Sequence, residues 1–452
     1  MVGARNMERE GLLLVDLGSS AVRVLAAVRD AAGLQLCAAA EQPCSAGRDG
    51  VLVHRELARE QLGAAVQEAV RQAGIPLRRA IAALGGTHLG MLRTSGSLQL
   101  KLPVSLRQTH LEQALEKAAC IGLPPDQEVL HVLPTSHRVD GATVARSPVG
   151  VRARLLVVEC ALVTASRLAL DNLERVFADL DLELLDVAAE PLVTAGALLG
   201  AEDRRRGAVL VDIGAERIGA VVYREHVLQG LACLGVGSAH VSRDLAYALQ
   251  LEFAAAEELK QRFGVAAVTA AAPGAETEIR RAGGSARLGQ EALAGVIEPR
   301  WRELLGLVRD ALRRSQALAP GDRVVLGGQG ARLPGSVAVA EAVFGLPARL
   351  AEECSSIPAA AAPAALRQRT SATALGLLDY ASRCAAHGAR RGPAWRDAVQ
   401  RLRHVFAAAA ARRTTGAAVR RATSIEAAAR QGGHEPLEGG VDLEVDDVRV
   451  RT

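Results

Sequence analysis

Two aspartates, Asp16 and Asp212, each end a short apolar run and stand two residues before a glycine. The runs, residues 12–15 and 208–211, are typical of buried β-strands. A strand holds the carboxylate in place, and glycine lets the backbone turn tightly and approach a bound group. Two such turns that face each other across a cleft can hold the phosphates and the metal ion of a nucleotide from both sides.

The elements around these turns repeat as well. Each Asp-x-Gly is followed by a second apolar run, residues 21–27 and 218–223, which we expect to pair back as a hairpin. A third buried strand, residues 323–326, runs into Gly327-Gly328. A single Asp-x-Gly is usually an ordinary turn, but this pair indicates a duplicated α/β core.

Between the two turns the pattern changes from about residue 85 to residue 166. Three alternating segments surround one helical segment there, which predicts a small inserted α+β unit. Helical and buried-strand patterns on either side return the chain to the main body. The predicted strands are 80–84, 95–101, 128–133, 152–163 and 183–188, and the predicted helices are 56–72, 106–121 and 167–180, with a further buried run at 371–380.

The composition limits the class of protein. The 452 residues have room for two or three domains, and with 2% aromatic residues the core must consist of Leu, Val, Ala and Ile. A net charge of +4 is too small to indicate a specific nucleic-acid partner. Seven scattered cysteines without a Cys-x-x-Cys argue against a disulfide framework or zinc site and fit a reducing cytoplasm. We find no signal peptide and no run of about 18 apolar residues, so we expect a soluble protein.

After about residue 385 the chain becomes rich in Arg and Ala and then acidic, which predicts disorder. Residues 394–410 are the exception, because apolar residues recur there at helical spacing opposite arginines. Such a basic amphipathic helix suits the interface of an anionic membrane, and docking on the body or on a protein partner is the alternative. Its apolar face carries Trp395, Val399, Leu402 and Phe406, and its basic face carries Arg396 and Arg403.

The order of these features resembles the FtsA family of bacterial cell-division proteins, within the actin-like ATPase superfamily. The resemblance covers roughly residues 10–382. It is carried by residues 129–134, 147–151, 242–249, 257–264, 325–328 and 373–378. It implies an α/β, actin-like two-lobed fold with duplicated sheet and helix cores and an inserted α+β subdomain.

The family's subdomains map onto this chain by the same resemblance. The second lobe would span residues 207–362, and its smaller subdomain would span about 241–314. The first lobe would consist of residues 9–85, 167–206 and 363–385, with the inserted subdomain at 86–166 and the basic tail at 386–452.

The resemblance also implies a function. Proteins of this family bind ATP, assemble into actin-like filaments and tether the tubulin-like protein FtsZ to the inner face of the cytoplasmic membrane. They also recruit later division proteins. The partners implied are the FtsZ C-terminal tail, other copies of this chain, later division proteins and the anionic membrane surface at the division site. The smaller subdomain of the second lobe would receive the FtsZ tail.

Site residues are carried over position by position. Asp16 and Asp212 would hold Mg²⁺ through water, and Glu190 would position the attacking water, although a carboxylate at a helix start is an equally good explanation of Glu190. Glu257 and Lys260 would contact the ribose and adenine. Gly18, Ser19, Ser20 and Gly214 would line the phosphates, and Gly327 and Gly328 would leave room for the nucleoside.

The second turn departs from the family pattern. The family continues Asp-x-Gly with Gly-Gly-Thr, whereas this chain has Ala215, Glu216 and Arg217. Ala21 stands where many members have Lys. Glu216 adds negative charge near the phosphates, while Arg217 can offset it or hold a phosphate itself. Because positioning and charge dominate phosphoryl transfer, we expect weakened or altered ATP binding and slow or absent hydrolysis.

Two other functions fit parts of the sequence. A PilM-like actin-fold scaffold of type IV pilus assembly would bind a peptide of an inner-membrane protein, and its second turn also tends towards Asp-Ile-Gly-Ala. Residues 148–150 and the helix at Trp395 argue against it. A small-molecule kinase would need an aspartate base and sugar-binding groups, for which we find no candidate.

Overall fold

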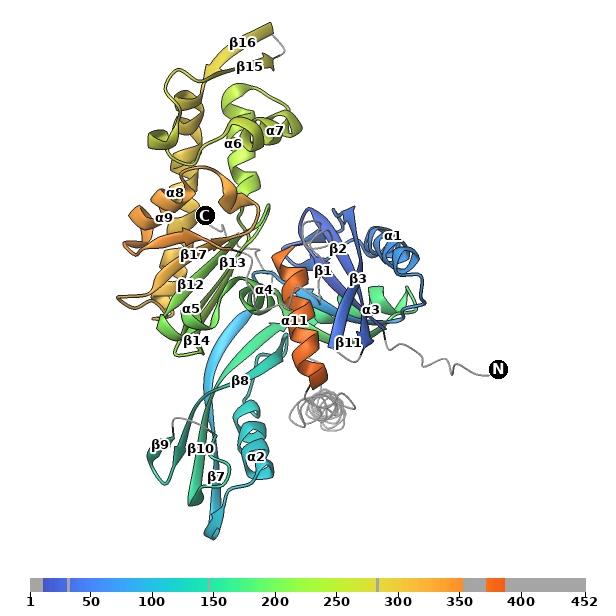
Figure 1. The fold of residues 1–452 in the computed structure, drawn as a ribbon, viewed down its shortest axis with the longest axis vertical. Helices are drawn as coiled ribbons and strands as arrows, with labels where there is room; N and C mark the ends of the chain where they lie inside the picture. The colour runs from blue at the N-terminus through green and yellow to red at the C-terminus, as the bar shows by residue number, and fades with distance from the viewer. Residues whose placement is uncertain (1–10, 31–32, 145–146, 282–283, 353–370, 387–452) are drawn as a thin grey trace, which may run out of the picture. The chain divides into compact units, whose positions relative to one another are not determined.

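A computed structural model describes residues 11–30, 33–144, 147–281, 284–352 and 371–386. It contains two five-stranded sheets of the same design (Figure 1). The first sheet has the order β11-β6-β1-β2-β3 and the second has the order β14-β13-β12-β17-β18. The strands of the first sheet are β1 (Gly11–Leu17), β2 (Ala21–Asp30), β3 (Gly33–Pro43), β6 (Arg79–Leu84) and β11 (Glu183–Ala189). Those of the second are β12 (Ala208–Ile213), β13 (Ile218–Arg224), β14 (Val227–Leu234), β17 (Arg323–Gly327) and β18 (Ala348–Leu350).

The strands of the two sheets pair in the same way around β1 and β12. β1 pairs antiparallel with β2 and parallel with β6, and β12 pairs antiparallel with β13 and parallel with β17. The register places Asp16 opposite Arg23 in the first hairpin and Asp212 opposite Gly219 in the second. Both Asp-x-Gly turns therefore leave the equivalent end of equivalent strands, as the sequence repeat predicts.

Apolar strands and helices form the core around both sheets. Leu13, Leu14 and Val15 of β1 are completely buried, as are Val209 and Val211 of β12. Such continuous burial is expected of strands covered on both faces by helices. The helices are α1 (Arg55–Ala73), α3 (Arg167–Ala178), α4 (Glu190–Leu198), α5 (Ala201–Arg206), α9 (Ser336–Phe344) and α11 (Ala372–Ala386).

Helices α4 and α11 pack closely against each other. A Cβ atom at Gly376 of α11 would collide with the backbone of Val193 in α4, so this crossing requires glycine. The hydroxyl groups of Thr194 and Thr373 lie 2.8 Å apart across the contact. The packing fixes the start of α11 beside the end of β1.

A separate four-stranded sheet, in the order β7-β10-β8-β9, is inserted after β6. Its elements are β7 (Gly90–Ser105), α2 (Gln108–Ala119), β8 (Gln127–Val139), β9 (Ala142–Val144) and β10 (Arg152–Ser166). The predicted strand at 95–101 is only the centre of β7, because β7 pairs along most of the length of β10. Arg93 of β7 donates to the main-chain oxygen of Gln229 in β14, at 3.0 Å.

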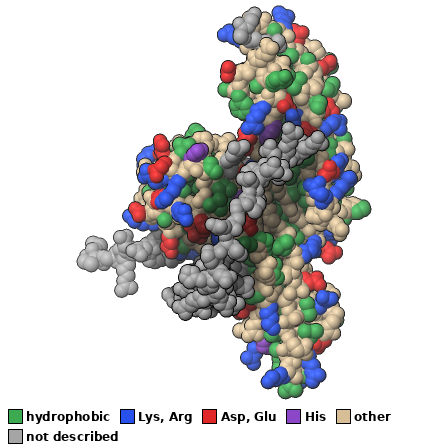
Figure 2. Space-filling model, turned by 180° about the vertical axis from the view of Figure 1, so that it is seen from behind, with side chains coloured by type: hydrophobic (Ala, Val, Ile, Leu, Met, Phe, Trp, Pro, Cys, Tyr) green, Lys and Arg blue, Asp and Glu red, His purple; other side chains and the backbone are tan. Residues whose placement is uncertain are grey.

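The second sheet carries further helices and a hairpin between β14 and β17. These elements are α6 (Ser238–Leu249), α7 (Phe253–Phe263), β15 (Glu276–Arg281), β16 (Gly284–Gly289) and α8 (Gln290–Arg314). Trp301 of α8 is completely buried and is the largest side chain of this core. Figure 2 shows acidic and basic side chains intermixed over one face of the described residues.

The strands and helices predicted from sequence are confirmed, with ends that shift by a few residues. No helix of the described residues is long and apolar enough to cross a membrane. The predicted amphipathic helix at 394–410, with Trp395, Arg396, Val399, Leu402, Arg403 and Phe406, lies outside the described residues.

Candidate nucleotide site between the two strand turns

A cavity of about 810 Å³ lies where β1 and β12 end. Its volume is in the range of small-molecule sites. All of the candidate nucleotide-binding and catalytic residues except Lys260 line this cavity. The lining includes Asp16, Gly18, Ser19, Ser20, Glu190, Asp212, Gly214, Glu257, Gly327 and Gly328.

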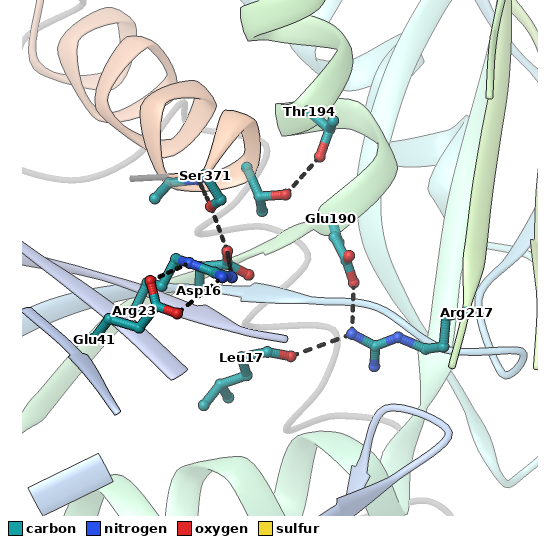
Figure 3. Close-up of polar contacts among 10 residues, drawn as sticks. Asp16, Leu17, Arg23, Glu41, Glu190, Thr194, Arg217 and Ser371 are labelled. Carbon is teal, nitrogen blue, oxygen red and sulfur yellow. Dashed lines mark hydrogen bonds and ion pairs between the residues drawn. The ribbon is translucent and has the colours of Figure 1, made fainter. Parts of the chain in front are cut away.

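Asp16, at the end of β1, has two polar partners (Figure 3). The Ser371 hydroxyl donates to Asp16 Oδ2 at 2.5 Å and accepts from the N–H of Ala374 at 3.0 Å, so it also caps α11. Arg23 Nη1 lies 3.9 Å from Asp16 Oδ2, and Glu41 holds the same guanidinium at 3.0 and 3.2 Å. Arg23 of β2 thus places a basic group beside the first turn, although Ala21 stands where many members of the family have Lys.

Sequence reasoning missed Arg23, Glu41 and Ser371, all of which line the cavity. Two signals point to them. A hairpin that pairs Leu17 with Val22 places Arg23 directly opposite Asp16, on the same face. Ser371 precedes a helical run, as N-cap residues do.

The second turn is closed by its own backbone and by α6. The N–H of Gly214 donates to the main-chain oxygen of Arg217 at 2.9 Å. The first N–H groups of α6, those of Ser238 and Ala239, donate to the carbonyls of Gly214 and Ala215 at 2.9 and 2.8 Å. These N–H groups, which are free at many helix starts, here fix the shape of the turn.

The two unusual side chains of this turn point in different directions. Glu216 pairs with Arg243 at 2.5 Å, and its N–H donates to Ser19 Oγ at 3.3 Å. Arg217 Nη2 donates to Glu190 Oε2 at 3.0 Å and to the carbonyl of Leu17 at 3.2 Å (Figure 3). Arg217 Nη1 donates to the carbonyl of Gly85 at 3.3 Å. Arg217 therefore contacts the first sheet through Leu17, and the backbone of Glu216 contacts the first turn through Ser19.

The two aspartates differ in their electrostatics. Burial and the charge of Glu190 raise the pKa of Asp16 to about 6, while Ser371, Arg23 and Arg217 act against the rise. Burial, Glu190 and Asp16 raise the pKa of Asp212 to about 7, and Arg217 is the opposing charge. The pKa of Asp212 is the higher of the two because Asp212 lacks counterparts of Ser371 and Arg23, which lower the pKa of Asp16, and because the charge of Asp16 adds to the rise.

The other end of the cavity is less charged. Burial acts to raise the pKa of Glu257, but hydrogen bonds from Lys260 and Ser242 outweigh it and lower the pKa. Lys260 is buried behind Glu257 and donates to it at 2.8 Å and to the carbonyl of Ser238 at 2.9 Å. Lys260 therefore supports Glu257, and the contact to the nucleoside that the resemblance implied for Lys260 stays a prediction. Phe253, 45% exposed, adds an aromatic wall that sequence reasoning did not select.

The backbone leaves space beside Asp212. At Gly328, with φ of +82°, a Cβ atom would collide with the carbonyl of Ile213, and at Gly327 it would lie 2.6 Å from Leu198 Cδ1. Only glycine permits this close approach of β17 to the second turn.

Comparisons with known proteins agree with this design. The family model for the cell division protein FtsA matches residues 209–376, and the model for the SHS2 domain inserted in FtsA matches residues 86–164. FtsA of Pseudomonas aeruginosa is 30% identical over 341 residues, which cover 74% of this chain and 81% of that protein. FtsA of Bacillus subtilis is 26% identical over 335 residues, covering 73% and 76%.

A solved structure of the PilM-PilN type IV pilus biogenesis complex has a TM-score of 0.57 at 17% identity, covering 82% of this chain and 98% of that one. At this identity the likeness shows the fold alone. Together the comparisons confirm the predicted fold class, an actin-like α/β fold with an inserted α+β subdomain. The chain belongs to the FtsA family of bacterial cell-division proteins.

Proposed function

We propose that this chain is a division scaffold that tethers FtsZ polymers to the inner face of the cytoplasmic membrane and assembles with copies of itself in an actin-like way. The observation that carries the proposal is a cavity between two Asp-x-Gly turns in a chain of the FtsA family. The inserted subdomain would serve filament contacts and the recruitment of later division proteins.

ATP is the ligand proposed for the cavity. Hydroxyl groups and tight turns on one side, with Arg23 and Arg217 nearby, suit phosphates. Within the described residues no group of three His, Cys, Asp or Glu side chains is arranged to hold a metal ion. As the family resemblance implies, the two buried aspartates would contact Mg²⁺ through water, and their raised pKa values fit a site that favours a cation. The ion would neutralise phosphate charge.

Slow or absent hydrolysis is part of the proposal. Glu190 is the candidate for positioning the attacking water, but Arg217 already donates to its Oε2. An oxygen engaged in this way is less available to orient water. ATP would then act as a structural ligand or switch for assembly.

The FtsZ tail is proposed to bind the subdomain at about 241–314. Tyr247 of α6 exposes 89% of its surface there, and exposed aromatic residues often dominate the energy of interfaces. Replacing Tyr247 by Ala should weaken binding of an FtsZ tail peptide about tenfold. Phe253→Ala serves as a control for a second exposed aromatic residue, since Phe253 faces the cavity.

The membrane contact is proposed for residues 394–410, outside the described residues. A single short helix of this kind binds weakly, so a filament that presents many copies would bind much better. A PilM-like function is the remaining alternative, and the comparisons favour it only at the level of fold.

Flotation with anionic vesicles tests the tether. Full-length protein with ATP should carry FtsZ to the vesicles, and a version that ends at Gly392 should leave FtsZ in solution. FtsZ without its C-terminal tail is the matched control. FtsZ recruitment that survives truncation at Gly392 would refute the proposed role of the helix.

A further inference from the structure

Arg217 stands in the second turn at the position where the family resemblance implies threonine, and its side chain is only 11% exposed. Its guanidinium leaves the second turn and makes three hydrogen bonds to the first sheet and α4, through Leu17, Gly85 and Glu190. A guanidinium with these partners joins both turns by one positive charge.

Close packing at Gly85 holds the groups that accept hydrogen bonds from this guanidinium. A Cβ atom at Gly85 would collide with Glu190 Oε2, so the carboxylate can lie here only because residue 85 is glycine. The carbonyl of the same glycine accepts from Arg217. Glycine, glutamate and arginine therefore form one unit across the cleft.

The charge of Arg217 reaches three carboxylates. It pairs directly with Glu190, and its hydrogen bond to the Leu17 carbonyl places it beside Asp16 at the end of β1. Asp212 lines the same cavity. Arg23, the other basic residue at the phosphate end, is engaged with Glu41 and lies on the Asp16 side. On the Asp212 side, Gly219 stands where Arg23 stands in the first hairpin, which leaves Arg217 as the basic residue of the second turn that can offset the charge of Asp212.

A divalent metal ion bound in the cavity would have the same two effects as the Arg217 guanidinium. It would neutralise the carboxylates and connect the two turns through phosphate oxygens. With Arg217 already present, an added Mg²⁺ gains less attraction from the carboxylates and meets repulsion from the guanidinium.

We propose that Arg217 is a built-in counter-cation of the phosphate site, which takes over from a divalent ion the neutralisation of Asp16, Asp212 and Glu190. Nucleotide phosphates then bind with little dependence on Mg²⁺. The inference rests on the proposed nucleotide function and deepens it, because it names how the site balances charge without the family's Gly-Gly-Thr.

Calorimetric titration of the full-length protein with ATP, in excess Mg²⁺ and in excess EDTA, tests the proposal. The Kd of the unmodified protein should change by less than about threefold between the two conditions. Arg217→Gln should bind at least about tenfold more weakly in EDTA than in Mg²⁺, and Arg217→Lys, which keeps the charge, should resemble the unmodified protein.

Arg243→Gln is the matched control, because Arg243 pairs with Glu216 of the same turn but is not among the residues that line the cavity. It should leave the Mg²⁺ dependence unchanged. Equal, strong Mg²⁺ dependence in the unmodified protein and in Arg217→Gln would overturn the inference and leave the nucleotide function standing. Absence of ATP binding in both conditions would overturn both.

A measurement without nucleotide covers the case in which Arg217→Gln is unstable. Mg²⁺ should raise the Tm of nucleotide-free Arg217→Gln, whose carboxylates lack their counter-charge, and should leave that of the unmodified protein unchanged. A Tm of Arg217→Gln that does not respond to Mg²⁺ would contradict the counter-cation role, since loss of a purely structural contact would give that result.

Discussion

The two Asp-x-Gly turns follow strands that pair in the same way, but different side chains surround them. At the first turn, Asp16 is supported by Ser371 and Arg23, and the turn itself carries glycine and serines. At the second turn, Asp212 faces Gly219, and the charged side chains belong to the turn. One turn receives its charge balance from neighbouring elements, while the other supplies Arg217 to the opposite sheet.

This difference shows that one half of a duplicated fold can change its turn while the cavity between the two halves is retained. The carboxylates and strands of both halves are retained, so the cavity persists. The turn that lost its glycines contributes a cation and a link between the sheets instead. The four predictions below test how far the two turns differ.

The largest expected effect is a change in the free energy of unfolding with pH. Because the pKa values of Asp16 and Asp212 are raised to about 6 and about 7, the folded protein binds more protons than the unfolded chain from about pH 4 to pH 7. The free energy of unfolding should therefore fall by a few kcal/mol as pH rises through this window. Denaturant unfolding at several pH values measures it.

Asp212→Asn should remove more of this pH dependence than Asp16→Asn, since Asp212 has the larger pKa shift. Glu190, Arg23 and Arg217 face these aspartates in both variants, so the difference between variants is the informative quantity. Equal flattening by the two substitutions would mean that the two turns do not differ electrostatically.

The second prediction concerns the turn itself. Replacing Ala215, Glu216 and Arg217 by Gly, Gly and Thr should strengthen ATP binding in Mg²⁺ at least about tenfold, because it restores close approach of the backbone to the phosphates. The same variant should bind much more weakly in EDTA. Calorimetry measures both, and an unchanged affinity in Mg²⁺ would show that the departures do not weaken the site.

The third prediction concerns the support of the first turn. Ser371→Ala removes the cap of α11 and the hydrogen bond to Asp16, and should lower the free energy of unfolding by about 1 to 2 kcal/mol. Ser382→Ala on the same helix removes only a bond to the Leu378 carbonyl and should cost less. Equal losses in the two variants would argue against the link between α11 and β1.

The smallest effect is expected for the ATP affinity when Glu216 is substituted. Its partner Arg243 is half-exposed and already balances its charge, so Glu216→Gln should change the ATP affinity by no more than about threefold. A tenfold gain from Glu216→Gln alone would show that its charge, and not the loss of glycine, weakens the second turn.

Much of this site could be predicted from sequence because its parts are local. An apolar run, an aspartate and a glycine within a few residues determine a strand and its turn, and they occur twice. Glu190 was selected through the family resemblance, and the structure places it at the start of α4, directly after β11. Composition and periodicity also predicted the inserted sheet and its helix.

The rest depends on contacts between distant segments. The role of Arg23 follows only from the hairpin register, and Ser371 reaches Asp16 only because α11 packs against α4. Lys260 was expected at the cavity wall, but its burial behind Glu257 depends on the carbonyl of Ser238 in α6. The direction taken by Arg217 depends on two sheets meeting, which no local pattern reports.

The most direct test of the central claim is the position of a fluorescent fusion in dividing bacterial cells, full-length beside a version that ends at Gly392. A midcell ring that becomes diffuse on truncation is the result that a membrane-tethered division scaffold predicts. A full-length protein at the poles or around the envelope, unaffected by truncation, would contradict it and favour a pilus-type scaffold.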